Sequence, residues 1–599
     1  MADTQTPSEQ TPLIEPTSKD ESPANLSAAR GLLIAVLMAF LIFIQATNIS
    51  MMTTAQSQIA ADLDAFAEAT WFTSAFMIAA SSVTPLAGRF SAIFTPRYCL
   101  VVSSMILSLG LFITAAAPSL AIFLLGRAVT GLGSGGLMSI SVILVLAFSS
   151  AKRRGLFIGL ISTNYTVGLS SGAVLAGLLT PIMGWRLIFW IQAPIALVMG
   201  PLLFLAIPPP SDDNNSLVKR NSLRSLARID YAGALTLTIS VVLLLTTLAS
   251  PEVLIWPIPL SLLFFAIFLL VESRWTQEPI IPVHLFLDRG VLLSCLSGVA
   301  LMMARWCVLF FTPVYAIAVR GWAPASAGLI LVPTNAGFGA GGILVGWLHI
   351  RKGGSYYASC LILYVLFSLA TVALSVLSTD HSSPVLYMTA TFFNGLFAGA
   401  LMNYTLSHLL HLTSPHMHYI VSALFTTFRG LAGSFGSAAG GGFFTRMLKA
   451  TLIRGFEQHG LPPKPDLVRT LLGSPATVSH LEGLERLIAV QSYEHAFRML
   501  FLAATVIALV ATVLQAGAGR KAGSEDKTNE WEERLLIECD PSIKSMILRY
   551  DEERHDYIVE DLDDENHLVI KESQLENLKA RLDHDLDEKI LQLDESDSE

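Results

Sequence analysis

The feature that most constrains the fold is a series of long apolar stretches. A bilayer core about 30 Å thick is crossed by roughly 20 apolar residues in a helix, and by this measure the chain holds fourteen spans. They lie near 31–54, 71–90, 99–117, 119–147, 155–180, 185–207, 231–249, 253–271, 291–315, 324–348, 356–377, 385–407, 419–445 and 495–516. Only 14% of the residues are charged and the mean hydropathy is +0.57, whereas soluble domains carry about a quarter charged residues. We therefore expect an all-α membrane protein.

Basic residues in the short loops predict the orientation of these spans. The loops on the side of both termini hold thirteen lysines and arginines, whereas the short loops on the opposite side hold only Arg186 and Arg320. Because cytoplasmic loops are enriched in Lys and Arg, we expect both termini in the cytoplasm. The long loop 446–494 then lies on the outer or lumenal side, where three leucines within 481–487 predict a short amphipathic helix.

The spans and the polar stretches between them divide the chain into six predicted segments. These are an N-terminal cytoplasmic tail (1–29), an N-terminal six-helix bundle (30–207), a cytoplasmic linker (208–230), two inserted helices (231–272), a C-terminal six-helix bundle (291–516) that includes the outer or lumenal loop 446–494, and an acidic cytoplasmic tail (517–599). From Asp551 to Glu599 the chain has 19 acidic and 5 basic residues, a net charge of −14. So acidic a segment favours disorder over the alternative, an amphipathic leucine helix that docks on a partner or on the bundle.

Glycines and arginines recur at fixed spacings in and after the early spans. They are Gly88 and Arg89 at the end of span 2 and Arg97 after it, Arg127 and Gly131 in span 4, and Gly159, Gly168, Gly172 and Gly177 in span 5. The turn Gly184–Pro194 joins spans 5 and 6, and Gly346–Gly353 weakly repeats the pattern after span 2. Together these patterns resemble the motifs of the major facilitator superfamily. The span 5 motif and the turn that follows resemble its fourteen-helix drug:proton antiporter branch, which includes fungal multidrug and vacuolar amino-acid transporters.

This resemblance, which covers about residues 30–516, implies a fold and a mechanism. The fold is two six-helix bundles with two helices inserted between them, and transport proceeds by alternating access around a midplane site between the bundles. The glycines and arginines of the motifs, other than Arg127, are expected to serve conformational change. The run Gly131–Gly136 also has the spacing of a dinucleotide-binding loop, but it lies inside an apolar span and does not follow a strand. Nucleotide binding is therefore not expected.

Three arginines lie inside apolar spans, at Arg127, Arg305 and Arg429. A charge near the bilayer centre costs at least ~2.5–3.5 kcal/mol, so each must face a cavity or a polar partner. One interpretation is that they line the path and attract an anionic solute, and the resemblance implies a coupling role for Arg127. The other is that they bond to backbone carbonyls and lock the bundle. Further path candidates are the uncharged polar residues Gln45, Asn48, Asn164, Tyr165 and Asn394, for which bonding between helices is the alternative.

Acidic residues are missing from the interior of every predicted span, and Asp230 and Glu272 sit only at span edges. Positions at which the antiporter branch carries an aspartate correspond to Asn48 and Ala92 here. Because proton-coupled carriers commonly use an embedded carboxylate, proton coupling stays an open question. Embedded arginines without carboxylates also disfavour a cationic substrate.

The sequence therefore predicts a secondary active transporter of small organic solutes that exports drugs or metabolites or sequesters them in a vacuole. We expect no enzymatic activity, cofactor, metal or nucleic-acid partner. The partners are the solute, the lipid bilayer, sorting adaptors and, if coupling is present, protons. Two alternatives stay open: a vacuolar basic amino-acid transporter, and a transporter-like receptor or regulator that does not transport.

Two short patterns bear on localisation. Glu9, Leu13 and Ile14 have the spacing of an acidic dileucine signal, which sorting adaptors read, and Glu532–Ile537 repeats it. This signal favours the vacuolar or endosomal membrane, with the plasma membrane as the alternative.

Overall fold

The computed structural model describes the helical body and part of the C-terminal segment. The described residues are 28–148, 151–208, 231–250, 254–274, 288–348, 356–413, 418–462, 464–519, 534–538, 540–554, 558–561, 567–571, 575, 578–579 and 581–582. They divide into two compact units, with the boundary between Gly519 and Arg520. The signal at Glu9, Leu13 and Ile14 lies outside the described residues.

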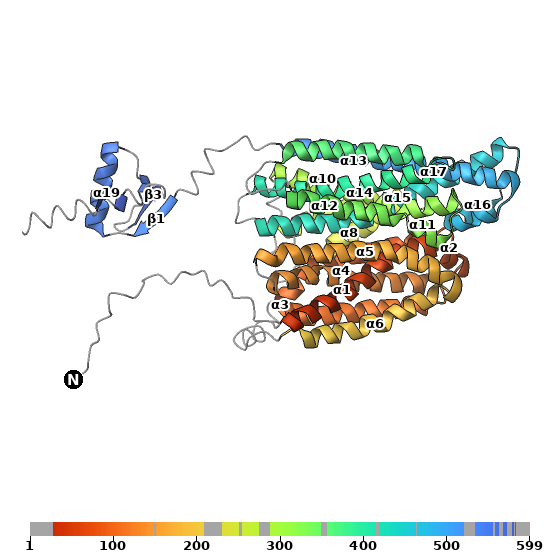
Figure 1. Ribbon diagram of the computed structural model, residues 1–599, viewed down its shortest axis with the longest axis horizontal. Helices are drawn as coiled ribbons and strands as arrows, with labels where there is room; N and C mark the ends of the chain where they lie inside the picture. Colours follow the sequence, from red (N-terminus) through yellow and green to blue (C-terminus); the bar gives the residue numbers. More distant parts are fainter. Residues whose placement is uncertain are drawn as a thin grey trace, which may run out of the picture. The chain divides into compact units, whose positions relative to one another are not determined.

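Six long apolar segments build the first half of the helical unit (28–206; Figure 1). Its helices are α1 (Ala28–Ser50), α2 (Met52–Asp62), α3 (Trp71–Ala115), α4 (Leu120–Phe148), α5 (Ala151–Met183) and α6 (Trp185–Ala206). The long helix α3 contains two predicted spans, separated by a kink at Thr95, where φ is 67°. Gly184, with φ at 75°, makes the turn between α5 and α6.

Two inserted helices follow, α8 (Tyr231–Ala249) and α9 (Pro257–Arg274). They are joined by reciprocal hydrogen bonds, in which the hydroxyl of Ser240 donates to the carbonyl of Ser261 at 2.9 Å and the hydroxyl of Ser261 donates to the carbonyl of Ser240 at 2.8 Å. Leu245 of α8 belongs to one buried cluster with Ile78 of the first half and Ala438 of the second. The inserted pair therefore packs where the two halves meet.

The second half (289–518) repeats the helical plan. Its elements are α10 (Arg289–Ala318), α11 (Pro324–Gly328), α12 (Leu331–Leu348), α13 (Tyr357–Leu377), α14 (Pro384–Leu412), α15 (His418–Gln458), α16 (Pro465–Gly473), the 3-10 helix η3 (Pro475–His480) and α17 (Gly483–Ala518). Among the described residues, twelve helices are long and apolar enough to cross a membrane. The other two predicted spans correspond to a shorter apolar helix, Trp71–Thr84, and to α15, so a count of fourteen stays a prediction.

The predicted amphipathic helix in the loop 446–494 is wrong in its position. Leu481 ends η3, and Leu484 and Leu487 lie in the first turns of α17. The short helix of this loop is α16 instead, which begins at Pro465 and ends at Gly473. Proline is favoured in the first turn of a helix, so Pro465 is the start signal of this helix in the sequence.

The C-terminal unit is a small α/β fold. It comprises β1 (Arg534–Glu538), α19 (Pro541–Arg554), β2 (Ile558–Asp561) and β3 (His567–Lys571). The sheet is antiparallel with strand order β1-β3-β2. The prediction of disorder is wrong for these residues, because the average acidity of the tail hid an alternating strand pattern in which Leu568 and Ile570 are buried. The second dileucine match also ends within β1, where Leu536 pairs with Val569.

Candidate functional site

The two halves meet in a close-packed seam formed by α5 of the first half and α11 of the second. A methyl group at Gly177 would lie 2.5 Å from the carbonyl carbon of Pro324 and 2.7 Å from Cα of Ala325. A methyl group at Gly328 would lie 2.7 Å from the carbonyl carbon of Ala173. Real side-chain carbons do not approach backbone this closely, so the seam depends on both glycines. We call these contacts the glycine seam.

The loop that carries α16 also binds the first half, at the end of the helical unit where α2, α11 and α16 lie (Figure 1). The guanidinium of Arg469 donates to the backbone carbonyl of Asp64 at 2.9 Å and lies 3.3 Å from its carboxylate. The side-chain amide of Gln56 donates to the carbonyl of Gly473 at 3.4 Å. The glycine seam and α16 therefore hold the halves together at one end, which the loop charges predict to be outer or lumenal.

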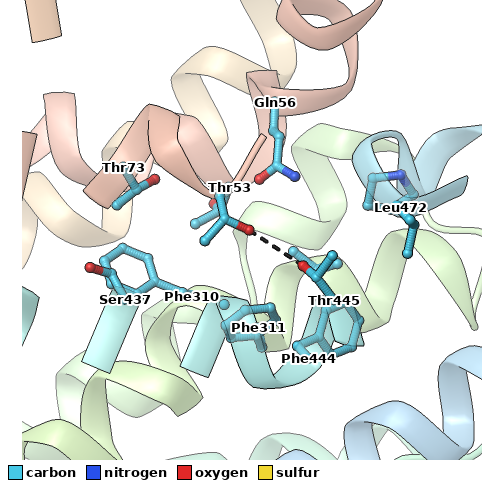
Figure 2. A pocket seen from close by; sticks show the side chains of 13 residues that line it. Thr53, Gln56, Thr73, Phe310, Phe311, Ser437, Phe444, Thr445 and Leu472 are labelled. Atoms are coloured by element: carbon cyan, nitrogen blue, oxygen red, sulfur yellow. Dashed lines mark hydrogen bonds between the residues drawn. The ribbon is translucent and has the colours of Figure 1, made fainter. Parts of the chain in front are cut away.

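A small cavity lies between the halves beside these contacts, and Figure 2 shows side chains of both halves around it. It is lined by Thr53, Gln56, Thr70, Thr73, Phe310, Phe311, Val314, Ser437, Gly441, Phe444, Thr445, Leu472 and Pro475. The hydroxyl groups of Thr70 and Thr445 lie 3.4 Å apart across it. Its volume is about 50 Å³, enough for a few water molecules. None of the described lining residues is charged.

A second, smaller pocket shares Thr53 and Phe310 with the first cavity. Its remaining lining residues are Ile49, Ser50, Leu169, Trp306, Leu309 and Leu331. Phe310 also packs with Phe76 and Leu169 of the first half in one buried cluster, to which Tyr165 and Trp306 add partly buried rings. Aromatic and hydroxyl-bearing side chains thus form the contact between the halves.

Arg127 does not line this cavity, because its side chain is fully buried within the first half. Its Nε donates to the carbonyl of Phe72 at 2.8 Å, and its Nη1 donates to the side-chain carbonyl of Asn48. The guanidinium also lies 4.8 Å from the centre of the Phe76 ring. The amide of Asn48 in turn donates to Gln192 at 3.0 Å. In this conformation Arg127 therefore joins α4 to α3, α1 and α6.

Arg305 makes the corresponding network in the second half, with one extension across the interface. Its guanidinium donates to the hydroxyl of Thr334 at 3.3 Å and to the side-chain carbonyl of Asn335 at 3.1 Å, above the ring of Phe338 at 4.4 Å. The amide of Asn335 then donates to the hydroxyl of Ser170 on α5 at 3.1 Å. We call this chain of contacts the Arg305 relay. It connects a buried charge of one half to the opposite half.

The other predicted path residues divide between the interface and helix packing. Tyr165 of the first half lies near Arg429 of the second half. Asn164 donates to the carbonyl of Ala39 at 2.7 Å, and Asn394 donates to the hydroxyl of Thr371 at 3.0 Å, so both bond within their own half. Gln45 is buried within α1.

The predicted conformational residues mostly serve close helix packing. Gly168 and Gly172 seat α5 on α1, since a methyl group at Gly172 would lie 2.5 Å from the carbonyl of Thr47. Gly131 likewise seats α4 on α3. Arg97 donates to the carbonyl of Phe204 at 2.7 Å and lies over its ring. Gly88 and Arg89 lie within α3, and Gly159 lies within α5.

Several residues of the interface and of the two arginine networks were missed from the sequence. They are Ser170, Gln192, Thr334 and Asn335 among the polar residues, and Phe76, Trp306 and Phe310 among the aromatic ones. The adjacent polar pair Thr334-Asn335 inside an apolar span was an available signal. The aromatic residues gave none, because aromatic side chains are equally common on lipid-facing surfaces.

The Arg305 relay yields a prediction about coupling between the halves. If Asn335 transmits the position of Arg305 to Ser170, Asn335→Ala and Ser170→Ala should each slow transport about threefold to tenfold, the effect of a net hydrogen bond of about 0.5–1.5 kcal/mol. The double variant should be no slower than the worse single variant. Initial transport rates in sealed vesicles measure this, with Ser162→Ala on the exposed face of α5 as control. Fully additive losses would contradict the relay.

The comparisons agree with this architecture. The sequence model of the Major Facilitator Superfamily matches residues 38–437. An efflux pump, FUS6, from Gibberella moniliformis is 29% identical over 381 residues, which cover 61% of this chain and 66% of the relative. The multidrug resistance protein fnx1 from Schizosaccharomyces pombe is 24% identical over 479 residues, which cover 78% of this chain and 88% of the relative.

Solved structures share the fold. A bacterial homologue of the human lysosomal transporter Spinster, in an inward-facing and occupied conformation, aligns with a TM-score of 0.57 and 13% identity, covering 82% of this chain and 97% of that one. A structure from work on proton-dependent oligopeptide transporters aligns with a TM-score of 0.52 and 11% identity, covering 82% of this chain and all of that one. At these identities the likeness shows the fold.

The C-terminal unit is similar to a different protein. The sequence model of the transcription factor TFIIH complex subunit Tfb5 matches residues 534–594. This match covers the small α/β unit and does not overlap the match in the helical body. The motifs, the paired halves and the match over most of the chain all point to the same family. The chain is therefore a multi-pass membrane protein that belongs to the major facilitator superfamily.

Proposed function

We propose that the chain is a secondary transporter that exports small, neutral, partly aromatic organic solutes by alternating access. The observation that carries the proposal is the cavity between the halves, which is lined by hydroxyl-bearing side chains from both halves and by aromatic rings from the second half. Aromatic rings such as Phe310 and Phe444 bind apolar rings, and the threonine hydroxyls provide hydrogen bonds. The names of the fungal relatives, an efflux pump and a multidrug resistance protein, support export of organic solutes.

The narrowness of the cavity supports alternating access. Ligand pockets usually measure about 300–1,000 Å³, so a solute enters only when the halves separate. The polar contacts that bridge them at this end are few and individually weak. The pair of Arg469 and Asp64, for example, is substantially exposed, and exposed ion pairs contribute about 0–1 kcal/mol. Such contacts allow the closed end to open at a cost that solute binding can offset.

The charge of the site favours neutral solutes over the basic amino acids of the alternative. Of the described residues around either pocket, none is an aspartate or glutamate that would pair with a cation. The two buried arginines, Arg127 and Arg305, are engaged by neighbouring oxygens instead of facing the cavity. Selection therefore falls to ring stacking and hydrogen bonding.

Transport by purified protein in sealed vesicles tests this proposal. We expect movement of a neutral aromatic solute, measured with and without a pH gradient to assign coupling. Phe310→Ala should raise the KM for that solute about tenfold, because burying a phenylalanine side chain contributes about 1.5–3 kcal/mol. Phe393→Ala, at an exposed ring on α14, is the matched control and should leave KM unchanged.

The other outcomes identify the alternatives. Accumulation of basic amino acids, with no movement of neutral solutes, would support a vacuolar amino-acid transporter and contradict the electrostatic argument. Movement of no solute from a broad panel would support a receptor or regulator that does not transport.

A second candidate function concerns the C-terminal unit alone. Because residues 534–594 match the Tfb5 family, we propose that this unit binds a protein partner as a subunit of a larger complex does. Affinity purification from native cells, with the full chain and with a chain that lacks residues 534–599, tests the idea. Recovery of TFIIH subunits only with the full chain supports it, and equal recovery from both contradicts it.

A further inference from the structure

The hydrophobic core of the C-terminal unit is built from its own residues. Ile547 and Tyr550 of α19 pack with Leu568 and Ile570 of β3 and with Leu578. All five are at most 5% exposed. The partly buried residues around them are Ile543, Met546, Leu548, Leu575 and Leu582. Every described residue of this core therefore comes from residues 543–582.

The backbone of the unit is paired in the same self-contained way. The central strand β3 pairs along one edge with β1, where Leu536 faces Val569, and along the other with β2, where Ile558 faces Ile570. All three strands lie within one stretch of about 40 residues, from Arg534 to Lys571. Short sequence separations between paired strands favour rapid folding. Domains of about 55–65 residues do fold alone, and the segment 534–599 has 66 residues, close to this size.

The helical body ends before this unit begins. Helix α17 stops at Ala518, and Gly519 follows with φ at 81°, a positive φ that favours glycine. The segment 519–533 then separates the last membrane helix from β1. The charges change as well: residues 534–599 contain 21 acidic and 8 basic residues, a net charge of −13, although the whole chain carries −9. An anionic membrane surface would repel so negative a domain.

From these observations we infer that residues 534–599 are an autonomous soluble domain, which folds and stays folded without the helical body and contributes nothing to transport. The chain thus joins two separable proteins, a membrane transporter and a small α/β domain. This inference goes beyond the proposed function, because it holds whichever solute the helical body moves.

The full-length chain in nanodiscs provides the test. A site-specific protease sequence is inserted after Ala522, and the protein is cleaved after reconstitution. We expect the C-terminal fragment to leave the nanodisc and to keep slow amide exchange at Leu568, Val569 and Ile570. Ile570→Asp places a charge in the core and serves as the control for the exchange measurement. Its fragment should exchange rapidly, while transport by the helical body stays unchanged.

Two results would overturn the inference. One is a fragment that stays on the nanodisc at 1 M salt, where electrostatic attachment is screened within about 3 Å, or that loses its slow exchange on release. The other is a fall in transport after cleavage. If neither the cleaved nor the intact chain transports any solute, the proposed function fails, and the exchange and release measurements still decide the inference.

Discussion

Gly177→Val is expected to slow transport about tenfold to a hundredfold while the protein still inserts into the membrane. The first carbon of the new side chain would lie 2.5 Å from the carbonyl carbon of Pro324 and 2.7 Å from Cα of Ala325. These are backbone atoms of a packed helix, so they cannot turn aside as the end of a flexible side chain can. Overpacking of this kind costs about 1–3 kcal/mol, and each 1.4 kcal/mol shifts an equilibrium tenfold.

The cost falls on the closed state alone, because the glycine seam exists only when the two halves are in contact. The variant should therefore populate the state that is open at this end, which faster labelling of a cysteine at Thr445 would report. Gly339→Val is the matched control, since the space around Gly339 on α12 is open within 4 Å. Equal transport by the Gly177 variant and wild type would remove the seam from the mechanism.

The second large effect is expected at Arg127, where Arg127→Gln should abolish transport and lower the stability of the first half. The substitution removes the donors to the carbonyl of Phe72 and to the side chain of Asn48. Buried acceptors left without donors cost about 1–3 kcal/mol each. The Asn48 side chain, which donates a hydrogen bond to Gln192, is then no longer held in place by Arg127. Four helices, α1, α3, α4 and α6, lose their common polar contact.

Thermal unfolding in detergent distinguishes this structural role from a direct role in coupling. The geometry predicts that the unfolding midpoint and the transport rate fall together, and that Arg127→Lys, which keeps one donor group, restores part of both. A variant with normal unfolding and no transport would instead assign Arg127 to the coupling step. The amount of each variant that is recovered from the membrane is measured as well, so that a loss of transport is not mistaken for a loss of expression.

The helical frame was predictable because bilayer thickness and hydropathy constrain it strongly. The glycine motifs were predictable for a related reason, since only glycine permits the contacts that Gly131, Gly172 and Gly177 make. The seam itself was not, because the partner of Gly177 is the backbone of Ala325, about 150 residues away along the chain. Any residue type can supply backbone atoms to such a contact, so the sequence does not mark the position that makes it.

The contacts of the embedded arginines could be predicted only in part. Hydropathy placed Arg127 and Arg305 in spans, and the cost of a buried charge required polar partners. Whether those partners are a solute or neighbouring oxygens depends on rotamers and helix register, and the structure places both side chains on neighbouring oxygens. The prediction of disorder for the acidic tail was wrong for another reason. The average charge of the segment hid five residues, His567–Lys571, whose alternate side chains Leu568 and Ile570 are buried and which form the central strand.

The distance between α2 and α16 tests the central claim, alternating access through opening of this end, most directly. Spin labels at Ala61→Cys and Asp466→Cys, both exposed positions, report it in a chain whose native cysteines are replaced by serine or alanine. We predict two distance populations, a short one that matches the closed seam and a longer one, whose ratio shifts when a transported solute is added. A single short distance that no solute changes would contradict alternating access at this end and favour a rigid, non-transporting protein.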